Sequence, residues 1–205
     1  MPIILRQIPV YNLLWHIQQY APTLEKKILD CGAGGGLPPL ALFNEHGFET
    51  HGIDISEDRI KMAEDFGKSK GMKLNIIQGD MRELPYEDES FSFVFSYNTI
   101  FHMTKKDIKK SILEIRRVMK KDGLCFINFM TMEDGMYGHG KELERGECVQ
   151  FEHGEEILHT FIDEEELEHF FEGFELIAID TRNIKRPLIW KDYVGSYYDC
   201  IVRKV

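Results

Sequence analysis

The sequence has 205 residues, of which 43% are hydrophobic and 29% charged, with a formal net charge of −10 at pH 7. This length and composition predict one soluble domain with a sizeable core. The acidic balance disfavours a nucleic-acid partner, because such affinity depends largely on Lys and Arg. No apolar run approaches the roughly 20 residues of a membrane span. The first residues lack the pattern of a signal peptide, so we expect a cytoplasmic protein without a membrane partner.

An amphipathic helix is predicted near the start, within residues 1–24. Leu13, Leu14 and Ile17 recur at helical spacing over residues 8–20. Two positions remain open for the aromatic residues Tyr11 and Trp15, which either pack on the edge of a sheet or reach toward a bound ligand.

A glycine-rich turn organises the next stretch. The run Ile-Leu-Asp-Cys-Gly-Ala-Gly-Gly-Gly-Leu spans residues 28–37, and Pro38 and Pro39 follow it. A short apolar strand therefore ends at Asp30 and opens into a turn before a helix. Leu37 stands where the dinucleotide fingerprint needs a third glycine, and no Gly-Lys-Ser/Thr follows, so neither phosphate motif is present. An acid at the start of the turn suits a ligand with an ammonium group.

Two further acids follow the next predicted strands. Asp54 ends the run that begins at Phe48, about 20 residues beyond Gly32, the interval at which a βαβ unit places an acid on ribose hydroxyls. Ser56 is the predicted N-cap of the helix that follows. Asp80 comes after the strand over residues 74–77. Because ligands bind at the carboxyl ends of parallel strands, three acids at consecutive strand ends predict one shared site.

The following elements continue the alternation of strand and helix. Residues 91–96 form a nearly unbroken apolar run, which suits a parallel strand covered on both faces. Thr104 and Asp107 predict a capping box before a helix that Gly123 ends, and residues 124–129 predict a fifth strand. Asp163 and Glu166 predict another capping box, followed by strands near 174–179 and 193–203. This regular alternation predicts a doubly wound α/β sheet.

Residues 131–160 interrupt the pattern with a long stretch rich in glycine, charge and histidine. Stretches of this length without regular elements are usually functional lids or disordered. The spacing of His139, His153 and His159 matches no metal site, and the four cysteines are far apart without a C-x-x-C pair. We therefore expect no metal, no disulfide framework and a closing segment over the site.

The glycine turn resembles motif I of the class I S-adenosylmethionine-dependent methyltransferases, and Ser96-Tyr97-Asn98-Thr99-Ile100-Phe101-His102-Met103 resembles motif IV of their small-molecule type. The resemblance covers residues 25–130 well and the segment 161–205 more loosely. It implies an α/β, doubly wound, seven-stranded, mostly parallel sheet of order 3-2-1-4-5-7-6, with an antiparallel last strand and helices on both faces, in one domain of residues 1–205.

The resemblance also implies S-adenosyl-L-methionine as cofactor. Asp30 would contact its amino end, Asp54 its ribose, and Asp80 with the backbone of Met81 its adenine. The complete set of expected cofactor-binding residues is Asp30, Gly32, Ala33, Gly34, Asp54, Ile55, Asp80, Met81 and Ser96.

The implied reaction moves the methyl group to a small-molecule acceptor by direct in-line displacement, without a protein nucleophile. His102 or Tyr97 is expected to accept or steer an acceptor proton, and a structural role for His102 stays equally open. The segment 131–160 resembles lids of the family at Gly138-His139-Gly140-Lys141-Glu142, with Tyr137, Phe151 and His159 as expected acceptor contacts. The alternatives are a cofactor-binding protein without turnover, an aminopropyl transferase, for which no clear acid pair is visible, and an RNA or protein methyltransferase.

Overall fold

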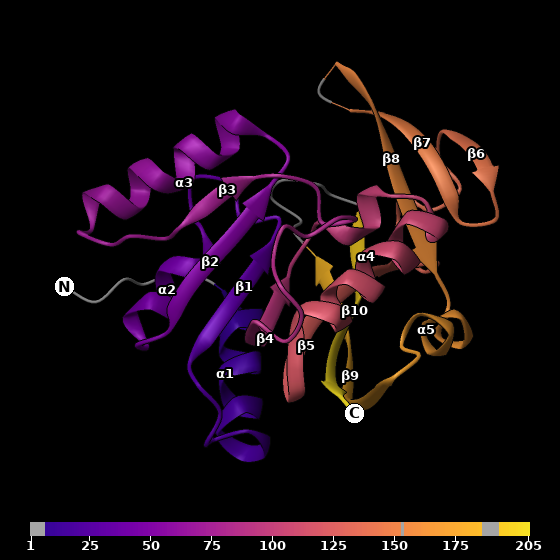
Figure 1. The fold of residues 1–205 in the computed structure, drawn as a ribbon. Helices are drawn as coiled ribbons and strands as arrows, with labels where there is room; N and C mark the ends of the chain where they lie inside the picture. The colour runs from indigo at the N-terminus through magenta and orange to yellow at the C-terminus, as the bar shows by residue number, and fades with distance from the viewer. Residues whose placement is uncertain (1–6, 153, 186–192) are drawn as a thin grey trace.

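The fold is built around a central β-sheet (Figure 1). The computed structural model describes residues 7–152, 154–185 and 193–205. The strands run in the order β3-β2-β1-β4-β5-β10-β9, and β10 is antiparallel to both of its neighbours. The first five strands of this path are parallel to one another. The predicted fold class and strand order are therefore confirmed.

The strands of this path carry the expected sequence runs. Their bounds are β1 Lys27–Cys31, β2 Glu49–Asp54, β3 Ile76–Gln78, β4 Phe91–Ser96, β5 Met119–Thr131, β9 Phe174–Lys185 and β10 Val194–Lys204. β5 begins earlier than predicted. A Cβ at Gly123 would lie 2.4 Å from the Ser92 carbonyl oxygen, so glycine here permits close strand approach instead of ending the preceding helix.

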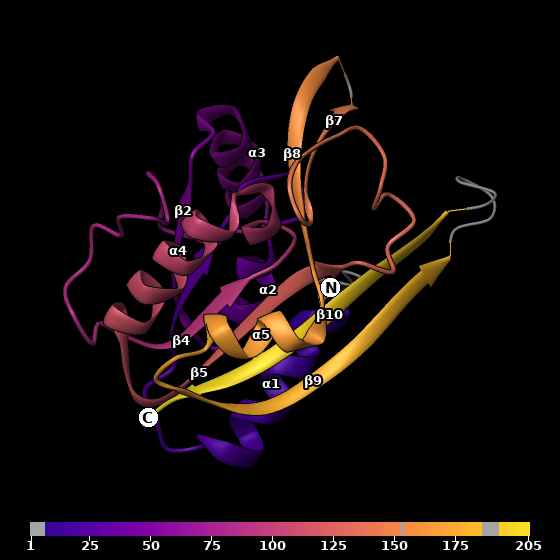
Figure 2. The same ribbon diagram turned by 90° about the vertical axis from the view of Figure 1, so that its right-hand side faces the viewer.

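Helices cover both faces of the sheet (Figures 1 and 2). One apolar core lies under α1 Ile8–Tyr20, α2 Pro39–Glu45 and α3 Glu57–Ser69, and the other lies under α4 Lys105–Val118 and α5 Glu164–Phe170. Ser56 caps α3 and Asp163 forms the predicted capping box with Glu166. Thr104 caps α4 by accepting from Asp107 N, but the Asp107 carboxylate bonds Arg82 instead of closing a box.

The segment 131–160 differs from the predicted loop. It contains β6 Lys141–Glu144, β7 Glu147–Glu152 and the start of β8 Glu155–Ile162, which pair antiparallel. β8 continues the sheet by pairing in parallel with the end of β5. We call β6, β7 and β8 the meander, and Figure 2 shows it standing above the sheet. Glycines with positive φ, Gly146 and Gly154, make its turns, because only glycine adopts that backbone freely.

The N-terminal helix lies on the sheet face and does not reach over the strand ends. Val10, Leu13 and Ile17 are buried in the core on that face. Tyr11 and Trp15 border a hollow that also includes His46 and Phe48, at the opposite ends of the strands. Of the two positions left open for these aromatic residues, the one that reaches toward a ligand at the strand ends is therefore not the one observed. Among the described residues, no helix is long and apolar enough to cross a membrane.

Candidate functional site

A cavity of about 310 Å³ opens where β1, β2 and β3 end. This is the place at which open α/β sheets bind their ligands, and the volume suits a small molecule. Its walls come from the glycine turn and from the ends of β2 and β3. The 3₁₀ helix η1 Ile100–His102, the start of α4 and β8 complete them. The lining residues are Gly32, Ile53, Asp54, Ile55, Gly79, Asp80, Met81, Arg82, Thr99, His102, Met103, Thr104, Asp107 and Leu158.

Asp54 joins the glycine turn to the cavity wall. Its carboxylate accepts hydrogen bonds from Gly34 N at 2.8 Å and from Ser56 N at 2.9 Å, and the residue is only 8% exposed. A Cβ at Gly34 would lie 2.6 Å from Oδ2 of Asp54, so a larger residue would displace the carboxylate. The glycine is therefore needed for the close approach of turn and acid.

Asp30 is buried beneath the same turn and contributes a carboxyl oxygen without a hydrogen bond. Its Oδ2 has no hydrogen-bond partner in the described part of the chain. Burial, and secondly the nearby Asp54 carboxylate, raise the pKa of Asp30 well above its usual range. A cation bound beside it would offset both the cost of burying the carboxylate and its repulsion from Asp54. The arrangement therefore fits a ligand that brings a positive group to the glycine turn.

Asp80 is held by an arginine that sequence reasoning missed. Arg82 binds both Asp80 oxygens through Nε and Nη2, and its Nη1 donates to Asp107 at 2.9 Å. Hydrogen bonding from Arg82 lowers the pKa of Asp80 below its usual range. The bridge fixes the acid at the cavity wall, between the end of β3 and the start of α4.

The remaining expected cofactor residues divide into two groups. Gly32, Ile55 and Met81 line the cavity, whereas Ala33 and Ser96 are buried behind it. The Ser96 hydroxyl donates to the Cys31 carbonyl at 3.2 Å, so its side chain links β1 to β4. Thr99 was not foreseen: its side chain fills the space that a Cβ at Gly32 would occupy, and it lines the cavity directly above that glycine.

His102 faces the cavity from η1. Its Nδ1 lies 3.3 Å from the Leu158 carbonyl oxygen on β8. Desolvation, followed by the neighbouring His159, lowers the pKa of His102 to about 4. A carbonyl oxygen only accepts, so Nδ1 carries the proton of this neutral ring and Nε2 is the acceptor. The ring is thus neutral near pH 7, with Nε2 as its hydrogen-bond acceptor.

Tyr97 lies outside the cavity lining. Its ring packs beside Phe95 and Phe126, and the Arg182 guanidinium lies 5.6 Å from the ring centre. Arg182 is itself held by both oxygens of the buried Asp199. A role for Tyr97 in proton transfer stays a prediction.

The described residues contain no group of three or more His, Cys, Asp or Glu side chains that could hold a metal ion. His153, one of the three histidines considered for a metal, lies outside those residues. The four cysteines are buried and unpaired. Burial raises the pKa of Cys31 well above its usual range, which keeps this thiol protonated and a poor nucleophile.

The fold and this cavity define the class I, Rossmann-like S-adenosylmethionine-dependent methyltransferases. Residues 29–127, just under half of the chain, match the family described as a methyltransferase domain. The strand order, the glycine turn and the acids at three strand ends are the features that the class shares with this chain.

Particular relatives agree with this class. The uncharacterized methyltransferase YcgJ of Bacillus subtilis is 33% identical over 100 residues, which are 48% of this chain and 38% of the relative. This chain spans less than half the length of the first curated relatives that it matches. A SAM-dependent methyltransferase of Methanosarcina mazei has the same fold, with a TM-score of 0.77 and 22% identity over 92% of this chain and 96% of that one.

A further structure with this fold is known with small molecules bound. The 1,6-didemethyltoxoflavin-N1-methyltransferase of Burkholderia thailandensis was crystallised with 1,6-didemethyltoxoflavin and S-adenosylhomocysteine. Its TM-score is 0.70 at 18% identity, covering 97% of this chain and 77% of that one, so the likeness extends to the fold.

S-adenosylmethionine, the cofactor of this class, fits the residues present. The unpaired buried oxygen of Asp30 calls for a positive group, which the amino end of the cofactor carries. The glycine turn presents bare backbone, and the apolar side chains of Ile55 and Met81 line the cavity near Asp80. The chemistry of the donor set therefore matches a ligand with an ammonium group, a ribose and an aromatic base.

Proposed function

We propose that the chain is an S-adenosylmethionine-dependent methyltransferase that moves a methyl group to a small-molecule acceptor by direct in-line displacement. The observation that carries the proposal is the pair of acids Asp54 and Asp80 on the cavity wall, together with Asp30, which lies beneath the adjoining glycine turn and has an unpaired buried oxygen. The net charge of −10 supports a small acceptor over a nucleic acid.

When bound, S-adenosylmethionine supplies the methyl group on a sulfonium and leaves as a neutral thioether. The chain's own residues bind and orient the cofactor. Asp30 holds the amino end, Asp54 the ribose hydroxyls and Asp80 the adenine side. Positioning of this kind supplies roughly 7 to 11 kcal/mol of a reaction barrier. No protein nucleophile is required.

His102 orients the acceptor in this proposal. Its unprotonated Nε2 accepts a hydrogen bond from the acceptor's O–H or N–H, and the proton passes to Nε2 as the attacking atom takes the methyl group. Because the pKa of His102 is lowered to about 4, the ring does not keep this proton and releases it to water. The acceptor is therefore one whose attacking group loses a proton.

The meander is proposed as the lid of the acceptor side. Of the expected acceptor contacts, His159 lies against His102, with ring centres 4.8 Å apart. Tyr137 packs on Phe161 inside the meander, whereas Phe151 is 76% exposed and lines a separate hollow. If the meander closes on the site, adding S-adenosylhomocysteine slows proteolytic cleavage within residues 131–160. Unchanged cleavage at saturating ligand would remove the lid from the proposal.

The test of the function uses labelled cofactor. The protein is incubated with methyl-labelled S-adenosylmethionine and a cell metabolite extract, and labelled species are identified by mass spectrometry. We expect a labelled small metabolite that disappears with the Asp54→Ala variant. Label in RNA or protein would contradict the small-molecule acceptor, and cofactor binding without any labelled product would favour a binding protein.

A further inference from the structure

Two polar side chains of the meander face each other behind the site without a hydrogen bond. Nδ1 of His159 and Oε1 of Glu152 are both buried, and neither has a hydrogen-bond partner among the described residues. The two atoms are 3.8 Å apart, and His159 is only 5% exposed. An unsatisfied buried polar group costs about 1 to 3 kcal/mol, so a hydrogen bond between this donor and this acceptor is strongly favoured.

The same histidine lies against His102. The two rings are tilted by 59°, with centres 4.8 Å apart. The backbone next to His159 completes the contact, because the Leu158 carbonyl oxygen accepts the Nδ1 proton of His102. One short stretch of β8 therefore contacts His102 through both a carbonyl and a ring.

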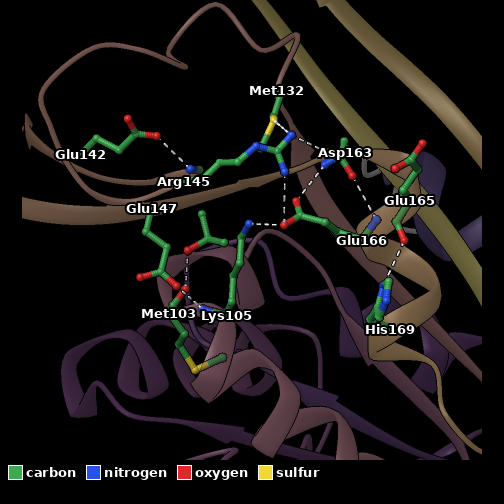
Figure 3. A network of polar contacts seen from close by, with 12 residues as sticks. Met103, Lys105, Met132, Glu142, Arg145, Glu147, Asp163, Glu165, Glu166 and His169 are labelled. Carbon is green, nitrogen blue, oxygen red and sulfur yellow. Dashed lines mark hydrogen bonds and ion pairs between the residues drawn. The ribbon is translucent and has the colours of Figure 1, made fainter.

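The base of the meander is fixed to the elements that carry His102. Oε1 of Glu147 accepts from Lys105 N at 2.6 Å, at the start of α4 (Figure 3). Lys105 also pairs with Glu166 of α5. The Thr160 hydroxyl donates to the carbonyl oxygen of Met103, the residue after His102, at 2.6 Å. These links set the position of His159 relative to His102.

We propose that Glu152 and His159 are positioning residues for His102. The Glu152 carboxylate accepts the Nδ1–H of His159. The His159 ring held in this way keeps the His102 ring against the Leu158 carbonyl, whose bond to Nδ1 selects the tautomer with a free Nε2. The inference rests on the proposed function, in which Nε2 of His102 meets the acceptor. Both residues come from the meander and act through His102 without contact with the cofactor cavity, whose lining includes neither.

Other charged groups face His102 and enter its titration. Their signs differ: His159 and Arg59 lower the pKa of His102, and Glu152 raises it. The charged side chains that line the cavity beside His102 are Asp54, Asp80, Arg82 and Asp107. A variant of Glu152 must therefore be compared with a variant that removes the same charge from the same hairpin.

Glu155→Gln is that matched control, because Glu155 is exposed and pairs directly across the strands with Glu152. Nitrogen NMR of ¹⁵N-histidine-labelled full-length protein reports the tautomer of each ring at pH 7, with His102 assigned from a His102→Gln sample. In the wild type we expect His102 to carry its proton on Nδ1. In Glu152→Gln we expect His159 and His102 to become tautomer mixtures, and the titration midpoint of His102 to fall.

Glu155→Gln should leave both rings as in the wild type. The exposed His169 should give the same nitrogen signals in all samples. Equal spectra for Glu152→Gln and Glu155→Gln would overturn the inference. S-adenosylhomocysteine binding by calorimetry is measured on the same samples and should stay within about twofold, since the pair lies outside the cavity. Failure of the wild type to bind it would contradict the proposed function, while the ring tautomers test the positioning pair independently.

With an acceptor in hand, kcat of Glu152→Gln should fall by roughly tenfold, part of the 10²- to 10⁴-fold effect of a general base, with KM for the cofactor unchanged. A rise of the cofactor KM with kcat unchanged would also contradict a positioning role.

Discussion

The cofactor side of the cavity and its meander side are built in opposite ways. Asp30 and Asp54 lie at the ends of β1 and β2, and Asp80 follows β3. These three strands are consecutive in the sequence, so each acid is positioned by its own strand end. The meander side depends on contacts between distant residues, such as His102 with Leu158. Local sequence determines the first side and tertiary pairing the second. We therefore expect substitutions on the first side to act on cofactor affinity and those on the second to act on stability or on the acceptor.

The largest expected effect is on the cofactor side. Asp54→Ala should weaken binding of S-adenosylmethionine and S-adenosylhomocysteine by about 10² to 10⁴, because two hydrogen bonds to a charged group contribute roughly 1.5 to 3 kcal/mol each. The change also leaves Gly34 N and Ser56 N without the hydrogen bonds that they donate to this carboxylate in the wild type. Calorimetry measures the affinity, with Asp58→Ala, an exposed acid in the first turn of α3, as control. Wild-type affinity in Asp54→Ala would break the comparison.

Asp30→Asn tests whether the buried acid meets the ammonium group. We expect a loss of about 10- to 100-fold in affinity, equal to one charge-assisted hydrogen bond. The pKa of Asp30 is raised well above its usual range, and only the ionised carboxylate binds a cation. The wild-type affinity for the cofactor should therefore rise with pH, from the usual pKa of an aspartate up to the raised pKa of Asp30. Below pH 7, where an α-amino group stays charged, the asparagine variant should show no such rise.

The free protein should respond to Asp30→Asn in the opposite direction. An acid with a raised folded pKa binds more protons folded than unfolded, so wild-type stability falls as pH rises through that interval. Asparagine removes this loss. Urea unfolding at pH 7 should therefore show equal or higher stability for the variant, and lower stability would contradict the unpaired carboxylate.

Much of the first side was predictable from sequence. β1 and β2 were visible because an apolar run leads to Asp30 in one and to Asp54 in the other. The helix α3 was visible from its capping residue Ser56. Arg82 and Thr99 were not foreseen, since their value depends on where Asp107 and Gly32 lie after folding. The sequence also did not indicate the direction of the Ser96 side chain, which bonds the Cys31 carbonyl within the sheet.

The meander was missed because its strands are rich in Glu, which is a weak strand former. All four residues of β6 are exposed, so no alternation of buried and polar residues identifies it. The signal that remains is the glycine at each turn, Gly146 and Gly154, between short runs that include Val149 and Ile157. The contact of His102 with His159 has no local signal at all.

Gly34→Ala sharpens the comparison with a smaller change. The new Cβ would lie 2.6 Å from both Oδ2 of Asp54 and Cβ of Arg59, so the acid must move. We expect roughly a tenfold loss of cofactor affinity, in line with about 1 to 3 kcal/mol for an overpacked position. Gly36→Ala is the matched control, since its Cβ would meet only Met62 Cε at 3.5 Å. Equal affinities for the two variants would show that the turn tolerates a displaced Asp54.

The smallest effect on affinity is expected at the base of the meander. Glu147 is 5% exposed and its carboxylate accepts from Lys105 N, where the positive end of α4 favours an anion. Glu147→Gln keeps the shape and loses the charge, so urea unfolding should show about 1 to 2 kcal/mol less stability. The exposed Glu144→Gln on the facing strand should change stability by less than about 0.5 kcal/mol. S-adenosylhomocysteine affinity should stay within about twofold in both variants, because the cofactor acids are held by their own strand ends; a large loss in Glu147→Gln would mean that the meander also shapes the cofactor side.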